Sequence, residues 1–215
     1  DKNANTEAIK DYFTKQTGFI AGTSIKYGAS LISAKTKHQD LAKGFYVGQR
    51  FHSEKVKRLA DGRCLHLGHL NKADGRWRIF IFGDIKNPID SKSSCHQLFE
   101  YLSKSQDSPI KKYTPKGSDI DSVIDIYTIL QCRDDLSIEH LHDFLLPTKV
   151  KYHLKDYEKV FSPISDNDIY ESRSINRETG CMVVVRPDQH IANILPLNGF
   201  QELESFFDGF MLLKL

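Results

Sequence analysis

Cys95 occupies a position from which a cysteine could do chemistry. It begins an apolar-periodic segment that follows the strand-like run WRIFIF at residues 77–82. In the first turn of a helix, the peptide dipoles lower the pKa of a thiol and favour the nucleophilic thiolate. Cys95 also falls on the same helical face as Leu98, Phe99 and Leu102, which is the pattern of a core-filling side chain. We therefore interpret Cys95 as a buried core thiol.

The alternative interpretation is a peroxidatic cysteine. Pro88 and Cys95 have the spacing of the P-x-x-x-[TS]-x-x-C motif of peroxiredoxins. Lys92 stands at the hydroxyl position of that motif, and no arginine within the segment is placed to stabilise a thiolate. The second cysteine of a dithiol motif is missing as well. A one-cysteine peroxiredoxin-like thiol peroxidase that uses Cys95 thus remains as the second hypothesis.

Other cysteine and histidine residues form weaker candidate metal sites. Cys64, His66 and His69 lie in the run CLHLGH, where residues 64 and 66 share one face of a strand and residue 69 points to the other. His140 and His142 are two apart on an expected helix and do not face each other. A C-x-x-C pair is absent. We expect no metal ligand among these residues.

Nucleotide fingerprints are also missing from the sequence. None of the 13 glycines forms a G-x-G pair or has P-loop spacing, and G-x-S-x-G does not occur. The net charge is +2, so the basic run KKYTPK at residues 111–116 reads as a solvated loop rather than a nucleic-acid site. No apolar run approaches the roughly 18 residues that would span a bilayer. These observations predict neither a nucleic-acid nor a membrane partner.

The elements around Cys95 follow from hydrophobic periodicity. Apolar side chains on both faces of residues 77–82 predict a central strand that helices cover on each side. Residues 91–104 have the period of an amphipathic helix. The β-branched run SVIDIYTIL at residues 122–130 predicts a second strand, so strand, helix and strand form a parallel unit.

The second half of the chain continues this alternation. SIEHLHDFLL predicts a helix at residues 137–146, capped by Ser137. Residues 151–180 are a polar connection whose length suggests a special purpose. CMVVVRPDQHIANIL predicts a hairpin whose turn at residues 186–189 sets its register. The less favoured alternative is that Arg186 makes an ionic contact with a neighbouring domain.

The C-terminal segment predicts an apolar helix that starts with a capping box from Asn198 to Gln201. Its inner stripe should cover the sheet and consists of Phe200, Leu203, Phe207, Phe210 and Met211. Phe206 and Leu213 widen the stripe beyond what one sheet face needs, which indicates a contact with a partner chain or an adjoining domain. Alternatively, residues 17–51 fold back over them.

The order β-α-β-α-β-β-α, with the last two strands antiparallel, is the thioredoxin-like arrangement. NTEAIKDYF predicts a short helix that begins at Asn5 or Thr6. Residues 17–56 contain glycines at short intervals and predict extended segments. We therefore expect an α/β protein: a thioredoxin-like fold at residues 51–215, with a central mixed β-sheet flanked by helices, after an irregular lead-in segment at residues 1–50.

Four stretches resemble the C-terminal domain of the phenol hydroxylases (phenol 2-monooxygenases), within the FAD-dependent aromatic hydroxylases. They are VKRLADGRCLHLGHLNKADGRWRIFIFGD, VIDIYTIL, DYEKVF and GCMVVVRPDQHIANI. The resemblance runs from about Phe45 to the C-terminus and points most strongly to fungal and yeast enzymes. Residues before it resemble the end of the flavoprotein body.

The resemblance implies a non-catalytic domain that serves dimerisation and structural support. Such domains resemble thioredoxin or peroxiredoxin but lack the redox cysteines. The parent enzyme would use FAD and NADPH to hydroxylate phenol to catechol, and both cofactors would bind its N-terminal portion. No catalytic, cofactor-binding or metal-binding residue carries over to this chain. Its expected partners are the N-terminal FAD and substrate domains of the same chain and a second copy in a homodimer.

The start of the sequence adds one expectation. The first residue is Asp1, and residues 1–20 carry no signal-peptide or transit-peptide pattern. We expect a cytoplasmic protein whose N-terminus lies upstream.

Overall fold

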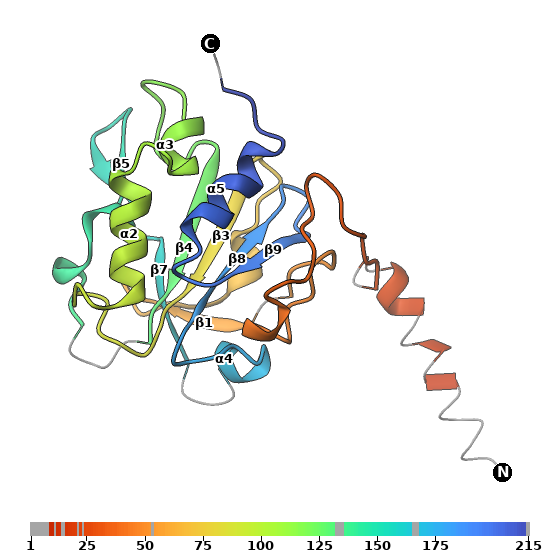
Figure 1. The fold of residues 1–215 in the computed structure, drawn as a ribbon. Coiled ribbons are helices and arrows are strands. Elements are labelled where there is room, and N and C mark those ends of the chain that lie inside the picture. Colours follow the sequence, from red (N-terminus) through yellow and green to blue (C-terminus); the bar gives the residue numbers. More distant parts are fainter. Residues whose placement is uncertain are drawn as a thin grey trace.

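A mixed seven-stranded sheet forms the centre of the protein (Figure 1), in the strand order β2-β1-β7-β4-β3-β8-β9, and β5 pairs with β6 separately. The computed structural model describes residues 9–10, 12–13, 16–20, 22, 24–52, 54–131, 136–164 and 168–213. The strands are β1 (Lys55–Arg58), β2 (Cys64–His66), β3 (Trp77–Phe82), β4 (Ile124–Ile129), β5 (Thr148–Lys149), β6 (Leu154–Lys155), β7 (Val160–Pro163), β8 (Cys181–Val185) and β9 (Ile191–Leu195). The fold is α/β and thioredoxin-like, with a central mixed sheet flanked by helices.

The helices are short apart from two. The α-helices are α2 (Ser94–Lys104), α3 (Pro109–Tyr113), α4 (Ile169–Ser172) and α5 (Phe200–Asp208). The 3₁₀ helices are η1 (Gln39–Leu41), η2 (Leu67–Leu70), η3 (Ile138–His140) and η4 (Asp143–Leu145). Residues 9–10, 12–13 and 16–20 are also helical, whereas the helix start predicted at Asn5 or Thr6 lies outside the described residues.

Strand β3 is the central strand that its two apolar faces predict. All six of its residues are buried, and it pairs in parallel with β4 and antiparallel with β8. The predicted unit of strand, helix and parallel strand is confirmed as β3, α2 and β4. The hairpin of β8 and β9 is confirmed as well, with the turn between Val185 and Ile191.

Two apolar layers cover the sheet. On one face, Trp77, Ile79 and Ile81 of β3 pack with side chains of α2, α3 and α5. On the other face, Phe80 and Phe82 pack with α4 and with side chains of residues 42–51. The side chains of β3 thus contribute to both layers, since successive side chains of a strand point to opposite faces.

The segment leading into the sheet belongs to the second layer. Phe51 stacks on Phe80 with ring centroids 4.4 Å apart, and Phe45 stacks on Phe51 at 4.9 Å. Apolar side chains from Ala42 onward therefore pack on the face opposite α5, and do not fold back over Phe206. The domain boundary expected between residues 50 and 51 stays a prediction.

Three further sequence predictions are wrong in detail. Residues 137–146 form η3 and η4 instead of one α-helix, because the Nδ1 atom of His142 accepts a hydrogen bond from the amide of Phe144 and starts a second turn. Ser137 still caps the first turn through the amide of Glu139. The loop that was expected to contain KKYTPK holds α3, and the polar connection at residues 151–180 holds β7, which pairs in parallel with β4 inside the sheet.

Helix α5 differs from prediction at both ends. Gly199 is its N-cap and no side chain caps it, so the capping box from Asn198 to Gln201 does not form. The helix ends at Asp208. Leu203 and Phe207 are buried as predicted, and the other apolar residues of the stripe pack against the same core while partly exposed.

Candidate functional site

The environment of Cys95 is that of an inert thiol. Its side chain is fully buried in the layer under α2. At the start of that helix, Asp84 accepts hydrogen bonds from the Ser93 hydroxyl at 2.9 Å and from the Ser94 amide at 3.0 Å. A carboxylate thus occupies the place where a helix N-terminus would stabilise a thiolate. Burial, followed by the charge of Asp84, raises the pKa of Cys95, so the protonated core thiol is the form that the structure favours.

The weaker metal candidates are only partly brought together. The strand ends at His66 and η2 turns the chain back, so the rings of His66 and His69 lie 5.5 Å apart instead of on opposite faces, a correction to the strand prediction. Cys64 is exposed on the short edge strand β2. His142 contacts Glu100 at 3.0 Å while His140 lies in η3. Among the residues described, no three His, Cys, Asp or Glu side chains are grouped to hold a metal ion.

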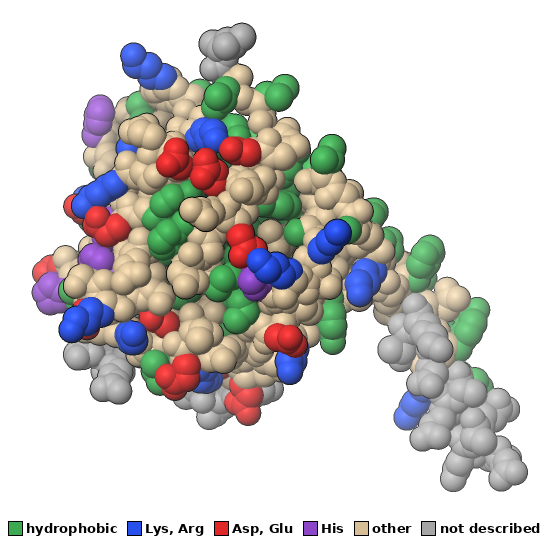
Figure 2. Space-filling model, viewed as in Figure 1, with side chains coloured by type: hydrophobic (Ala, Val, Ile, Leu, Met, Phe, Trp, Pro, Cys, Tyr) green, Lys and Arg blue, Asp and Glu red, His purple; other side chains and the backbone are tan. Residues whose placement is uncertain are grey.

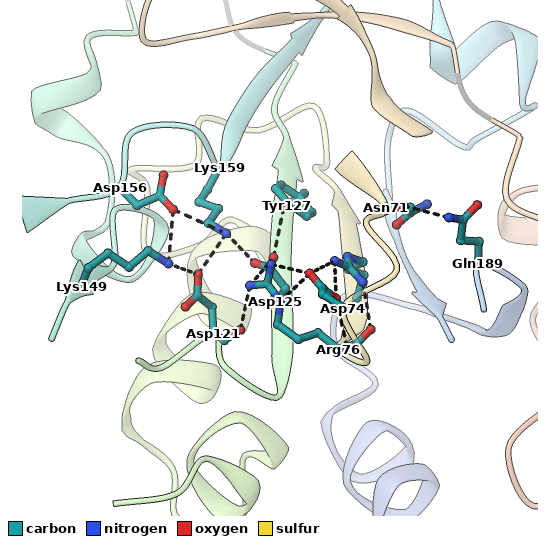
Figure 3. A network of polar contacts seen from close by, with 11 residues as sticks. Asn71, Asp74, Arg76, Asp121, Asp125, Tyr127, Lys149, Asp156, Lys159 and Gln189 are labelled. Atoms are coloured by element: carbon teal, nitrogen blue, oxygen red, sulfur yellow. Dashed lines mark hydrogen bonds and ion pairs between the residues drawn. The ribbon is translucent and has the colours of Figure 1, made fainter. Parts of the chain in front are cut away.

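A largely buried ion network that the sequence did not predict crosses the amino ends of β3 and β4 (Figure 3). Asp74 contacts the guanidinium groups of Arg76 at 2.8 Å and Arg78 at 2.7 Å. Arg76 also reaches Asp125 at 3.0 Å, and Asp125 accepts a hydrogen bond from the hydroxyl of Tyr127 at 3.0 Å. A charged residue in each of two mostly apolar strands, Arg78 and Asp125, was the available signal in the sequence, and the structure makes the two register partners.

The network continues toward β7 through Lys159, which contacts Asp125 at 2.6 Å and Asp121 at 3.0 Å. Lys149 binds the same Asp121 carboxylate, and Asp156 lies 3.4 Å from Lys149 and 3.6 Å from Lys159. Four carboxylates therefore meet four cations. Buried charges that are fully paired are the form in which a protein interior tolerates them.

The pKa shifts follow this pairing. Burial opposes ionisation of Asp74, but hydrogen bonds from Arg76 and Arg78 outweigh it and hold its pKa well below the usual range. Burial likewise opposes ionisation of Asp121, and Lys159 and Lys149 still leave its pKa lowered. Burial, with Asp125 nearby, raises the pKa of Tyr127 to about 12. The ion pairs thus favour the ionised forms of Asp74 and Asp121, as expected of a structural element.

A small cavity lies beside the network, lined by Asp121, Asp125 and Lys159 together with apolar side chains of β4, α3 and η4. Its volume of about 20 Å³ is room for roughly one water molecule. The cavity is therefore far smaller than the pockets of about 300 Å³ or more that hold organic ligands.

Arg186 links the β8–β9 turn to the lead-in segment of its own chain. Its guanidinium donates to the Ser33 hydroxyl at 3.1 Å, pairs with Asp188 at 2.5 Å and lies 4.9 Å from the centre of the Tyr27 ring. Within this chain, the ionic partner of Arg186 is Asp188 of the same turn.

Exposed apolar side chains gather in four places in the described part of the chain. They are the lead-in segment, with Phe19, Ile20 and Leu31 prominent; the loop before α2, with Ile85 and Ile89; the β5–β6 ribbon, with Val150, Tyr152, Leu154 and Tyr157; and the end of the chain, with Leu212 and Leu213. On the face drawn in Figure 2, charged side chains of both signs alternate over the body of the protein. Apolar patches of this kind mark surfaces that a second protein surface covers.

Comparison with known proteins agrees with a chain built for association. The family model for the phenol hydroxylase C-terminal dimerisation domain matches residues 25–215. A 3-hydroxybenzoate 4-monooxygenase of Comamonas testosteroni is 43% identical over 207 residues, which are 94% of this chain and 32% of the relative. An FAD-dependent monooxygenase of Aspergillus terreus is 34% identical, and a phenol 2-monooxygenase of Aspergillus fumigatus 27%, each over 94% of this chain and 34% of the relative.

The bacterial relative is thus more similar than these two fungal ones, whereas the resemblance pointed to fungal and yeast enzymes. The chain spans about a third of the length of the curated relatives that it matches. Among solved structures, the thioredoxin domain of a thiol-disulfide oxidoreductase from Bacteroides vulgatus aligns with a TM-score of 0.45 and 15% identity, over 76% of this chain and 96% of that one. No helix in the described part of the chain has the length and apolar character needed to cross a membrane.

The match to the family model covers all seven strands of the sheet and every labelled helix. The relatives also align over nearly the whole chain. The chain belongs to the family of phenol hydroxylase C-terminal dimerisation domains.

Proposed function

We propose that this chain is the domain through which an FAD-dependent monooxygenase forms a homodimer, and that it also supports the preceding part of the same polypeptide. The match of the dimerisation-domain family over residues 25–215 carries this proposal. The inert setting of Cys95 supports an associating role over a thiol peroxidase, because a peroxidatic cysteine must be an accessible thiolate.

The parent enzyme, in this proposal, uses NADPH and FAD to hydroxylate a phenolic ring beside its hydroxyl group, as in the conversion of phenol to catechol. The names of the relatives, a 3-hydroxybenzoate 4-monooxygenase and a phenol 2-monooxygenase, support a phenolic substrate. Both cofactors would bind the FAD and substrate domains that precede this chain, since the chain has no glycine fingerprint for a dinucleotide. We place the parent in the cytoplasm, without a nucleic-acid or membrane partner.

Deleting residues 25–215 from the parent enzyme tests this division of labour. The truncated enzyme should keep its flavin, measured by absorbance after gel filtration, and should fall from dimer to monomer in light scattering. The deleted domain, produced as the 215-residue chain, should be colourless. A truncated parent that remains a dimer, or flavin that copurifies with the 215-residue chain, would contradict the proposal.

A further inference from the structure

The β5–β6 ribbon, here residues 147–157, presents the densest group of exposed apolar side chains on the body of the protein. Tyr152 and Leu154 are each 66% exposed, and Val150 and Tyr157 are nearly half exposed. The ribbon is separate from the main sheet, and each of its strands has two residues. An isolated pair of strands is marginal in water and gains stability when another layer packs on it.

The ribbon is held firmly in this exposed position. The Val150 amide donates to Asp119 at 2.6 Å, and the Asp156 amide donates to the carbonyl of Pro147 at 2.9 Å. At its base, Lys149 joins the ion network, and Lys155 pairs with Asp143 at 3.1 Å. Contacts at both ends of the ribbon thus keep its apolar side chains directed outward, so they are presented as a preformed surface.

The edge of the sheet at β9 is closed to a second copy. The Ala34 amide donates to the carbonyl of Ala192 at 2.8 Å, so the lead-in segment lies along this edge. The side chain of Asn193 accepts a hydrogen bond from the amide of Ile194 at 2.9 Å. Donors and acceptors that are already occupied cannot extend the sheet across a two-fold axis. Sheet extension through β9 is therefore blocked, which leaves side-chain surfaces, or the three-residue edge strand β2, for dimerisation.

The ribbon also lies on the opposite side of the molecule from the N-terminal segment (Figure 1). In the proposed function, on which this step rests, the flavoprotein body joins the domain at that segment. The ribbon therefore stays accessible when the body is attached at that segment.

We propose that the β5–β6 ribbon is the contact surface for a second copy of this chain, packed ribbon against ribbon about a two-fold axis. In such an isologous contact each ribbon presents the same residues to the other. Lys155 is paired with Asp143, Asp156 with Lys149, and the ammonium of Lys151 lies 4.9 Å from the centre of the Tyr152 ring. Two ribbons can thus meet without opposing unpaired carboxylates, and the four apolar side chains of each become buried.

Two charge substitutions test whether the ribbon or the lead-in segment forms the dimer contact. In the 215-residue chain, Leu154→Glu should raise the dimer Kd about 30-fold or more, because the charge would be buried at the centre of the contact. The matched control is Leu31→Glu, at a side chain that is 75% exposed, and its Kd should change less than threefold. Sedimentation velocity over a concentration series measures both constants, and circular dichroism verifies that each variant is folded.

Cross-linking gives an independent measurement. A two-fold contact places Lys151 near its own copy, so Lys151→Cys in a Cys64→Ser background should form a disulfide-linked dimer under mild oxidation. Leu31→Cys in the same background should not. Weakening by Leu31→Glu that equals that of Leu154→Glu, or an unchanged Leu154→Glu dimer, would overturn the ribbon assignment and leave the proposed function standing. A wild-type chain that is monomeric at every concentration would overturn both.

Discussion

Replacing Asp125 with asparagine should destabilise the fold more than any change to a surface charge. Asp125 is fully buried and contacts Lys159, Arg76 and the hydroxyl of Tyr127. Asparagine keeps the size of the side chain and one oxygen acceptor but removes the negative charge. Lys159, which is itself buried, and Arg76 would then lose one of their counter-ions.

The expected loss of stability depends on the counter-ions that Lys159 and Arg76 keep. Removing one partner of a buried ion pair costs about 3–5 kcal/mol. Lys159 keeps Asp121 at 3.0 Å, and Arg76 keeps Asp74 at 2.8 Å, so the lower end of that range applies. We expect Asp125→Asn to lower the free energy of unfolding by about 3 kcal/mol. With a urea m value of about 3 kcal/mol/M, the midpoint moves down by about 1 M.

Urea unfolding followed by tryptophan fluorescence is the assay, because Trp77 is nearly buried beside α5. Protein concentration must be equal in all samples, since association adds to apparent stability. Asp40→Asn is the control: its carboxylate is 95% exposed and lies 4.0 Å from Lys43, so its effect should stay below about 0.5 kcal/mol. Equal midpoints for the two variants would show that the network is not a buried, mutually dependent unit.

Three further predictions concern acid, thiols and the lead-in segment. The pKa of Asp74 is lower in the folded than in the unfolded chain, so its stabilisation is present above about pH 4 and is lost as pH falls below that value; Asp74→Asn should flatten the decline of the urea midpoint in acid. In a thiol titration of the native chain, Cys64→Ser should remove a rapidly reacting thiol, while Cys95→Ser should leave the rapid phase unchanged and cost about 1–3 kcal/mol for a buried hydroxyl. Arg186→Ala should cost about 1.5 kcal/mol by removing a charged hydrogen bond to Ser33, with faster amide exchange at residues 27–33 and no change at α2. Unchanged amide exchange at residues 27–33 in Arg186→Ala would contradict the contact between Arg186 and Ser33. Loss of the rapid thiol phase in Cys95→Ser would contradict the burial of Cys95.

Local periodicity was enough to predict the centre of the fold. The alternation in β3 and the apolar stripe of α2 each repeat over several residues, so the packing that they imply needs no knowledge of distant segments. The same holds for the hairpin of β8 and β9, whose strands are joined by a short turn with a clear composition.

Strand β7 could not be predicted in this way. It contributes four residues within a polar stretch, and their burial comes from pairing with β1 and β4, which are distant in sequence. The two 3₁₀ turns at residues 138–145 similarly depend on one side-chain hydrogen bond, from the Phe144 amide to His142, that overrides an apparent helical period. Tertiary contacts and single caps are the terms that a periodicity argument omits.

The ion network could be predicted from the sequence only in part. A charged residue in an apolar strand is visible in the sequence, as Arg78 and Asp125 are, and such residues are paired when buried. Lys159 and Asp121 come from other parts of the chain, so the identity of the partners depended on the sheet order. The candidate dimer surface on the ribbon was likewise hidden, because a two-residue strand gives no periodic signal.

Sedimentation equilibrium of the 215-residue chain is the most direct test of its role as a dimerisation domain. A dimerisation domain should show a concentration-dependent mass that rises to twice the 24.6 kDa of one chain, without flavin absorbance in the concentration gradient. A mass of 24.6 kDa at every concentration, from a chain shown to be folded by circular dichroism, would contradict this role.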